Sequence, residues 1–552
     1  MKRFLVAAAA ALLALAMLAG CRGDGDGGTP GEIAGEAFHA DWTYDTSPIT
    51  FDVYFNASWF TDEWTTDEPT RSSSYITRKT GVDINFIAPT GNEAERFQTM
   101  IASRDVPDIM LFSPYDVGAR QAMDAGLFLN LVELAERYDP TFFDVVTASQ
   151  IGWLEHRPGV LYSWPNFSHS YEAAMAMDYE ARSALSGHPM VGVRHDIYEA
   201  IGRPDMSYPE GFLNALIAVR EQFPTVDGMP FYLMQMEFGD FGSQFIDQYI
   251  PELMGLPQTT DDGFFDPLTY EPYLEWLRTL RLANEMGLIA RDTFIDGRPQ
   301  WQEKMAGARY FMITMGRADQ HGNNSTLWSD MGGQETGVWY EVAYAFNHPD
   351  GRDPRIGGSL LLDGWMNLHI TVNNRDPARA IRFLNFIMGP EGQHNVFFGE
   401  HGVTWDYVDE IPTIHEHVLN APWEDFSRRY FVNGSNWAFW NSDIQVSFPE
   451  APREWHPSDG WRDFGNRYMV LLPEWQGMTI DTALHPDIAI IDTNIGMEWG
   501  SVLPRMLMAD SDEEFDSILE SFLQRREQLG FAQLQEVRWN MLQDNKVRLG
   551  RN

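Results

Sequence analysis

The apolar positions after residue 48 change their period along the chain and predict alternating strands and helices. Ile49, Phe51, Val53 and Phe55 alternate with polar or intervening residues, as in a β-strand. Later segments place apolar side chains on one helical face. The expected elements are a strand over 49–55, a helix over 72–79, a strand over 82–87, a helix over 92–103 and a buried strand over 106–112. This order predicts a parallel sheet with helices on its faces.

The ends of these strands indicate where a ligand would bind. In open α/β sheets, ligands bind beyond the carboxyl ends of the strands. The first strand continues into residues 56–60 (NASWF) and the third into residues 113–116 (SPYD). These two loops are therefore the first places where we expect a binding site.

The first 47 residues have the composition of an export signal followed by a tether. A basic start precedes an apolar run over residues 4–18, and these roughly 15 residues are fewer than the roughly 20 that span a membrane. The next residues end in LAGC, which resembles a bacterial lipobox whose cysteine receives a diacylglycerol. We expect a signal peptide over 1–20, a lipidated Cys21 and a flexible Gly/Asp-rich tether over 21–47. An ordinary signal peptide with a chance cysteine is the alternative.

Composition excludes several function classes. Cys21 is the only cysteine in 552 residues, so a lipidated chain has no thiol left for a disulfide, a metal or a nucleophile. The formal net charge of −41 repels nucleic acid and anionic lipid headgroups, so we expect no nucleic-acid partner. A solvated acidic surface explains this charge more simply than an acidic binding site.

The aromatic content points to sugar binding. With 44% hydrophobic residues the chain is globular, and its length indicates two or more domains. The 19 tryptophans, 20 tyrosines and 35 phenylalanines exceed what core filling usually needs. Exported proteins that handle sugars expose such rings to stack on pyranose faces, although most of these rings will lie in the core.

Several segments resemble one family of transport proteins. YITRKTG at 75–81, VDINFIAP at 82–89 and MIASRDVPDI at 100–109 resemble the first lobe of extracellular solute-binding proteins of family 1, the carbohydrate ABC transporter type. The chain looks most like the large lipoprotein branch, with LplA-like and alginate-oligosaccharide-binding-like members. The resemblance continues through 125–134, 193–202, 283–294 and 376–392 to a helical tail over 515–548.

The resemblance implies an α/β, periplasmic-binding-protein-like fold with two lobes, crossing hinge segments and C-terminal helices. It implies lobe 1 over 48–166 plus about 365–410, and lobe 2 over about 167–364 plus 411–552. A carbohydrate, most simply an oligosaccharide, is clamped between the lobes and delivered to the transmembrane subunits of an ABC permease. The implied protein is a non-enzymatic monomer without cofactor, held by its lipid on the extracytoplasmic face of the membrane.

One segment departs from the family pattern. Many relatives carry a calcium loop after the helix over 210–220, whereas this chain has QFPTVDGMPFY at 222–232 with Asp227 as its only carboxylate. Calcium prefers six to eight oxygen ligands, so we expect no calcium there. The 14 histidines show no compelling ligand spacing, so we expect no other metal site.

The candidate ligand-binding residues lie at strand ends and, by the family analogy, in crossing segments. Tryptophan rings would stack on sugars, and amides, hydroxyls and carboxylates would bind sugar hydroxyls. Trp164 and Trp365 are the strongest stacking candidates. For Asp108 a structural role is favoured. Trp59 is equally well explained as a ring that caps the lobe, and the loop over 433–443 is nearly as well explained as a buried plug. The candidates are Asn56, Ser58, Trp59, Asp108, Ser113, Tyr115, Trp164, Asn166, Trp365, Asn367, Asn436, Trp437 and Trp440.

Two other functions remain open from the sequence. A sensor or scavenger lipoprotein of the same fold, binding sugar or peptide, would have the same features. An exported glycoside hydrolase would also show an aromatic cleft with two acids, but paired carboxylates occur by chance among 80 acidic residues.

Overall fold

The structure is a computed structural model that describes residues 41–116, 118–176, 190–236, 244–315, 318–329, 331–358, 362–432, 436–448, 455–478, 480 and 484–550. The expected signal peptide, Cys21 and the tether through residue 40 lie outside the described residues. So do residues 433–435 of the candidate loop. Among the described residues, no helix has the length and apolar character needed to cross a membrane.

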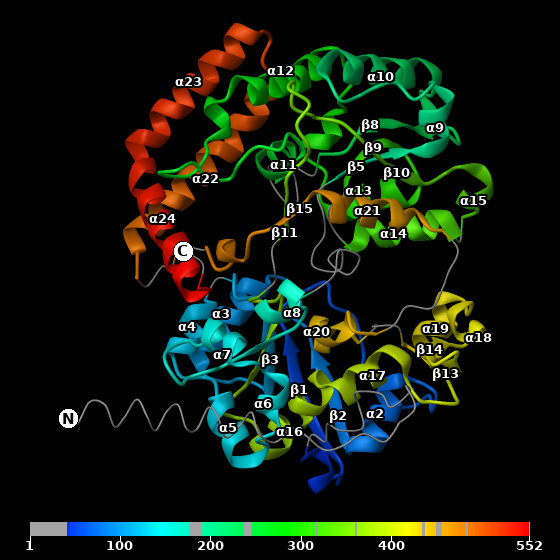
Figure 1. The fold of residues 1–552 in the computed structure, drawn as a ribbon, viewed down its shortest axis with the longest axis vertical. Helices are drawn as coiled ribbons and strands as arrows, with labels where there is room; N and C mark the ends of the chain where they lie inside the picture. The colour runs from blue at the N-terminus through cyan, green and yellow to red at the C-terminus, as the bar shows by residue number, and fades with distance from the viewer. Residues whose placement is uncertain are drawn as a thin grey trace, which may run out of the picture. The chain divides into compact units, whose positions relative to one another are not determined.

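The first sheet has the strand order β2-β1-β3-β12-β4 within the described residues, and Figure 1 labels its strands β1, β2 and β3. Its strands are β1 (Ile49–Phe55), β2 (Val82–Ile87), β3 (Ile109–Phe112), β4 (Trp164–Pro165) and β12 (Asn367–Ile370). Strand β1 runs parallel to β2 and β3, whereas β12 is antiparallel to β3 and β4. The expected strand and helix order is confirmed, with α2 (Ser72–Thr80) and α3 (Glu93–Ser103) between the first three strands.

Local signals in the sequence set the ends of these helices. The Asn92 side chain accepts the backbone N–H of Glu95 at 3.2 Å and begins α3. Gly81 ends α2 in the left-handed region, and its N–H donates to the Thr77 carbonyl at 2.8 Å. Strand β3 begins at Ile109 and not at Val106, since Pro107 lacks the N–H that a sheet ladder needs.

Further helices cover the first sheet. Phe97 and Met100 of α3 bury their side chains in one cluster with Met110 and Phe112 of β3. The remaining helices of this lobe before the crossing are α4 (Ala119–Asp124), α5 (Leu131–Tyr138), α6 (Phe142–Val145) and α7 (Ala148–Leu154), and those after the return are α16 (Pro377–Met388) and α17 (Pro390–Phe398).

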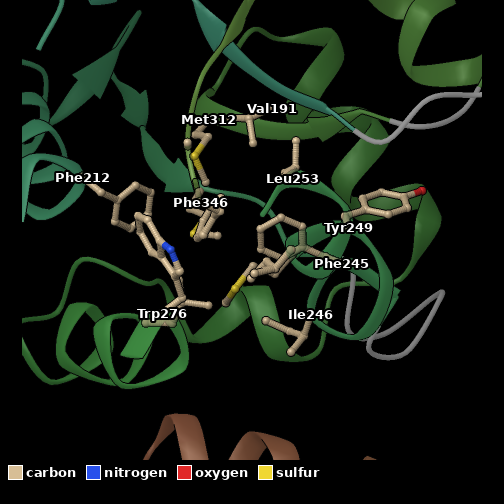
Figure 2. Close-up of a cluster of buried hydrophobic side chains, with 14 of the residues drawn as sticks. Val191, Phe212, Phe245, Ile246, Tyr249, Leu253, Trp276, Met312 and Phe346 are labelled. Atoms are coloured by element: carbon tan, nitrogen blue, oxygen red, sulfur yellow. The ribbon is translucent and has the colours of Figure 1, made fainter. Parts of the chain in front are cut away.

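The second sheet has the order β10-β5-β9-β8. Its strands are β5 (Met190–Arg194), β8 (Tyr232–Met234), β9 (Tyr310–Met315) and β10 (Tyr340–Ala343). Figure 2 shows part of the core of this lobe, where Met312 of the sheet faces rings such as Phe212, Trp276 and Phe346. Its helices include α9 (His195–Ala200), α10 (Pro209–Gln222), α11 (Ile250–Leu253), α12 (Glu271–Glu285), α13 (Arg298–Ala306), α14 (Ala318–Ser329), α15 (Gly333–Thr336) and α21 (Pro457–Tyr468).

Three long helices near the end of the chain complete the second lobe. They are α22 (Pro486–Leu507), α23 (Asp512–Leu529) and α24 (Phe531–Arg548). Leu503 and Leu507 of α22 and Phe515 of α23 belong to the same buried cluster as Trp276 of α12. The expected C-terminal helices are therefore present, and they contribute to the core of the second lobe.

The chain passes between the two sheets in separate segments. It leaves the first sheet after β4, passes α8 (Tyr171–Ala176) and reaches β5, then returns to the first sheet at β12. Strand β11 (Ile356–Gly358) on the return path pairs in parallel with β15 (Met469–Leu471), which follows α21. This short sheet ties two of the crossing segments together.

Residues after 410 pack differently from the sequence-based division. The hairpin of β13 (Trp405–Val408) and β14 (Ile411–Ile414) is followed by α18 (Glu416–Leu419), α19 (Trp423–Arg429), a 3₁₀ turn over Trp437–Phe439 and α20 (Ser442–Gln445). Ser72 of α2 donates its N–H to the Tyr430 carbonyl at 2.9 Å, and Asn441 Nδ2 donates to the Met388 carbonyl at 2.8 Å. These contacts favour a first lobe of 48–166 plus about 365–448, and we propose this boundary in place of 410.

The segment over 222–232 forms a small hairpin. Strands β6 (Thr225–Val226) and β7 (Met229–Pro230) pair antiparallel around Asp227 and Gly228, which both have positive φ. The expectation that this segment binds no calcium stays a prediction.

Candidate functional site

Three tryptophans from distant segments are in ring contact beside the carboxyl end of β1, where one of them stacks on the other two. We call Trp59, Trp365 and Trp437 the tryptophan shelf. The ring centroids of Trp59 and Trp365 lie 5.8 Å apart at 15°, and those of Trp59 and Trp437 lie 6.0 Å apart at 20°. Trp365 and Trp437 lie 5.2 Å apart. Trp59 is 49% exposed, while the other two rings are partly buried.

The shelf rests on the end of strand β1. Phe55, the last residue of the strand, stacks on Phe60 with centroids 4.1 Å apart and meets Trp437 edge-on at 5.2 Å. Asn56 continues the strand by donating its N–H to the Leu111 carbonyl at 2.8 Å. Because Phe55 and Phe60 are buried, they hold the loop that carries Trp59.

The return crossing positions Trp365 through a close backbone approach. Gly364 has φ +63, and a Cβ there would lie 2.3 Å from the Asn166 carbonyl oxygen. Asn166 is buried, and its Oδ1 accepts the Met366 N–H at 2.8 Å. Its Nδ2 donates to the carbonyls of Trp437 and Ala438, both at 3.4 Å. Asn166 therefore joins two of the segments that carry the shelf.

A second ring pair extends from the shelf. Phe167 stacks on Trp440 with centroids 4.9 Å apart and meets Trp365 edge-on at 6.3 Å. The Phe167 N–H donates to the Trp440 carbonyl at 2.9 Å. Four of the five tryptophans expected at the site, all except Trp164, are thus connected through ring contacts.

Trp164 does not belong to this group. Its side chain is 1% exposed, pairs through β4 with Leu368 of β12, and meets Phe142 edge-on at 5.6 Å. A ring buried on both faces offers no surface to a sugar, so we correct its assignment from stacking residue to core residue.

Carboxyl groups border the shelf. Asp62 accepts a hydrogen bond from the Trp437 side chain, and burial raises the Asp62 pKa. Glu93 accepts the Ser58 N–H at 2.8 Å. Asp116 accepts Asn56 Nδ2 at 2.7 Å, and its pKa is raised mainly by burial.

Asp363 is a fourth carboxylate close to the shelf in sequence, two residues before Trp365. It accepts hydrogen bonds from Trp153 Nε1 and, at 3.3 Å, from the Tyr115 hydroxyl. Burial raises the pKa of both Asp363 and Tyr115.

The other expected polar residues have mainly structural contacts. Asp108 is buried and accepts the N–H groups of Asp52 and Arg375, at 2.9 and 2.8 Å, and so supports the structural alternative. Ser113 Oγ accepts the Tyr115 N–H at 3.2 Å. Asn367 donates to Ser163 Oγ, and Asn436 donates to Ser72 Oγ.

Sequence reasoning missed several residues around the shelf. Phe167 has a positive φ that no pattern signals. Asp62 and Glu93 reach the shelf only through the fold, because they lie in a loop and at the start of α3. Asp116 and Asp363 fall inside segments that the strand ends and the crossing had already pointed to.

A separate cavity of about 460 Å³ lies elsewhere on the first lobe. Its lining includes Asp105, Val106 and Pro107, which precede β3, together with Arg96 and Arg375. Arg375 is paired with Asp52 and Asp108, each at 2.7 Å. This arginine is thus bonded to two carboxylates of the protein, and within the described residues no tryptophan lines the cavity. Within the described ranges, no group of three or more His, Cys, Asp or Glu is arranged to hold a metal ion.

Comparisons with known proteins show which solved structures share this fold. No protein-family model and no curated protein matches the chain. Several solved structures do match. One is the crystal structure of alginate-binding protein AlgQ2, with a TM-score of 0.60 and 17% sequence identity over 90% of this chain and 98% of that one. The substrate-binding protein FusA of an S. pneumoniae ABC transporter, in complex with kestose, matches with a TM-score of 0.63 and 14% sequence identity. This match covers 90% of this chain and 100% of that one.

A third similar structure is an ABC-transporter-associated solute-binding protein from Bifidobacterium longum infantis that binds HMO, with a TM-score of 0.58 and 12% identity over 92% of this chain and 100% of that one. At such low identity these likenesses establish the fold. The chain has the periplasmic-binding-protein-like fold of substrate-binding proteins, with two α/β lobes, crossing segments and C-terminal helices. The proteins of this fold that it matches are binding proteins.

Proposed function

We propose that this protein is the substrate-binding component of an ABC importer, that it captures a carbohydrate on the tryptophan shelf, and that it delivers the sugar to a permease. The observation that carries this proposal is the stacking of Trp59, Trp365 and Trp437 at the carboxyl end of β1, the position where sheets of this class bind ligands.

The chemistry of the shelf suits a sugar. Indole faces contact the apolar C–H faces of pyranose or furanose rings, and nearby carboxylates and amides accept or donate hydrogen bonds to hydroxyl groups. Asp62 and Asp116 each have acceptor capacity beyond the bonds described above, since a carboxylate offers about four acceptor positions. The similar structures bind carbohydrates by their titles, which supports the same ligand class here.

The delivery role rests on the amino-terminal sequence. A lipid on Cys21 and the tether over 21–47 would hold the protein beside a permease in the same membrane and raise its effective concentration there. The importer, the lipid anchor and the extracytoplasmic location are parts of this proposal.

Binding to a glycan panel, followed by tryptophan variants, tests the proposal. A ligand at 100 times its Kd stabilises the folded state by roughly 2.7 kcal/mol, so a thermal shift identifies binders. Replacing Trp59, Trp365 or Trp437 by Ala should then weaken the best binder by roughly tenfold or more in titration calorimetry, because each removes a stacking face.

Trp423→Ala is the matched control. Trp423 is 71% exposed and stacks on Phe426 of α19, outside the shelf, so its loss should leave the Kd unchanged. Equal affinities of wild type and all three shelf variants would show that the sugar binds elsewhere. Absence of any thermal shift with carbohydrates, together with a shift by peptides, would overturn the ligand class.

A further inference from the structure

Carboxylates make most of the charged contacts with the tryptophan shelf and its loop. Asp62 contacts Trp437 of the shelf, and Glu93 contacts the backbone of Ser58, next to Trp59. Asp116 is bonded to Asn56 in the same loop, and Glu93 raises its pKa further through repulsion. A ligand that lies on the shelf is therefore close to carboxylates from three different segments.

Asp363 adds a carboxylate on the return crossing. It is bonded to Tyr115, the neighbour of Asp116, and it precedes Trp365 by two residues. Asp62, Glu93 and Asp116 thus reach the shelf or its loop from the loop after β1, from α3 and from the loop after β3, and Asp363 joins them through Tyr115. Within the described residues, these carboxylates do not form a group that could hold a metal ion.

The arginine beside Asp62 is held by the protein itself. Arg71, whose charge acts on Asp62, donates to the carbonyls of Ser427 and Glu63 and lies 4.4 Å over the Phe431 ring. Backbone carbonyls and a ring face hold this guanidinium. It is therefore not arranged to donate two parallel hydrogen bonds to a ligand carboxylate, as arginines in carboxylate-binding sites do.

Two further arginines lie near the carboxylates that border the shelf. Arg548, whose charge acts on Asp363, donates to the carbonyls of Gly152 and Trp153 and lies 4.5 Å over the Trp153 ring. Arg96 of α3 lines the separate cavity with Tyr54, and its charge opposes those of Glu93 and Asp116 at the Tyr54 hydroxyl. The long-range field of a chain with formal net charge −41 has the same sign as the carboxylates of the shelf.

We infer that the shelf selects uncharged or amino-substituted oligosaccharides and rejects those that carry carboxylate or sulfate groups. This inference rests on the proposed function and adds the ligand's charge to it. A uronate on the shelf would lie against like charges and lose hydration without gaining an arginine partner, whereas a neutral hydroxyl donates to the same carboxylates. An ammonium group on an amino sugar would gain an ion pair.

A matched glycan set tests the inference on the mature full-length protein. The set contains neutral tetrasaccharides (malto-, cello-, manno- and fructo-oligosaccharides), chitosan tetrasaccharide, and acidic tetrasaccharides (oligogalacturonate and alginate), measured by calorimetry at pH 8. We expect the tightest binder to be neutral or amino-substituted and each acidic glycan to bind at least roughly tenfold more weakly. Raising NaCl from 0.05 to 0.5 M should narrow this gap, because salt screens the repulsion.

Charge-removing variants separate the local carboxylates from the net charge. The double variant Asp62→Asn, Glu93→Gln keeps acceptor oxygens at both positions and should narrow the gap between acidic and neutral glycans by roughly threefold or more. The control Asp105→Asn, Glu136→Gln removes the same charge from exposed positions of the first lobe and should leave the gap unchanged.

The outcomes distinguish the two claims. An acidic glycan that binds as tightly as the best neutral one overturns the charge inference while the sugar-binding function stands. A panel in which no carbohydrate binds overturns the proposed function and the inference with it. An equal change in both double variants would assign the selectivity to net charge and overturn the role of the shelf carboxylates.

Discussion

Glu252 is a buried carboxyl group in α11 that contacts the crossing strand β11. It is 7% exposed; Oε1 accepts Gln248 Nε2 at 3.3 Å, and within the described residues Oε2 has no hydrogen-bond partner. Its backbone carbonyl accepts the Arg355 N–H at 2.7 Å, just before β11. Burial raises the Glu252 pKa from 4.5 to about 8.

This pKa predicts a pH-dependent stability. The folded protein holds a proton that the unfolded chain releases above about pH 4.5, so the stability from this proton is complete below that pH and is lost as the pH rises toward 8. Glu252→Gln removes the titration. We expect the variant to gain stability relative to wild type between pH 5 and pH 8.5, on the order of a few kcal/mol.

Denaturant unfolding at the two pH values measures this effect. Glu136→Gln, an exposed glutamate of α5, serves as the control and should show the same difference from wild type at both. A Glu252→Gln variant whose difference from wild type does not change with pH would mean that the buried carboxyl is not protonated near neutral pH.

Trp59 and Trp164 occupy similar positions in the sequence but differ in solvent exposure. Both follow or form the end of a strand, yet Trp59 is 49% exposed and Trp164 is 1% exposed. The difference arises because β4 pairs with β12, some 200 residues later, and Phe142 covers the Trp164 ring. No local pattern encodes that pairing, so the stronger stacking expectation fell on the buried ring.

Gly364 allows the return crossing to pass close to β4. A Cβ at this position would lie 2.3 Å from the Asn166 carbonyl oxygen and 2.4 Å from Pro165 Cβ, at φ +63. Gly364→Ala should lower the free energy of unfolding by about 1–2 kcal/mol for the left-handed backbone and by roughly 1–3 kcal/mol more for the overlap. It should also weaken sugar binding, because Trp365 follows directly.

Gly126→Ala is a control that separates the cost of the left-handed backbone from the cost of the steric overlap. Gly126 has φ +65, but nothing lies within 4 Å of a Cβ there, so this variant carries the backbone cost alone. Denaturant unfolding and calorimetry of both variants give the comparison. Equal losses in stability and unchanged binding would show that the crossing tolerates a side chain at Gly364.

The elements of the first lobe differ in how far they could be predicted. Strands β1 and β2 match their expected bounds because alternation and Gly81 are local signals. The segment over 411–448 was expected in the second lobe, but the contact of Tyr430 with α2 and that of Asn441 with Met388 favour the first. Short elements such as the turn over Trp437–Phe439 have no period, so only their contacts reveal where they pack.

The tether and the lobes together define the proposed transport role, and Cys21 is the residue that tests it. Cys21→Ser should move the protein from the membrane fraction to the soluble exported fraction, because a protein without the acyl chains has no anchor in this proposal. Its affinity for the sugar should stay the same in calorimetry, since the binding residues lie far along the chain. A variant that remains in the membrane fraction after high-salt washing would contradict a lipid anchor.

The sequence by itself determined the order of strands and helices at the start of the first lobe, and it predicted the loops in which to look for a ligand, an export segment and an aromatic binding site. These follow from local periodicity, turn residues and composition, which act over a few residues. Only the tertiary structure decided which tryptophans stack, which one is buried, and which carboxylates border them. The ring contacts of Trp59 with Trp365 and Trp437 join positions hundreds of residues apart, and burial depends on the packing of the whole lobe.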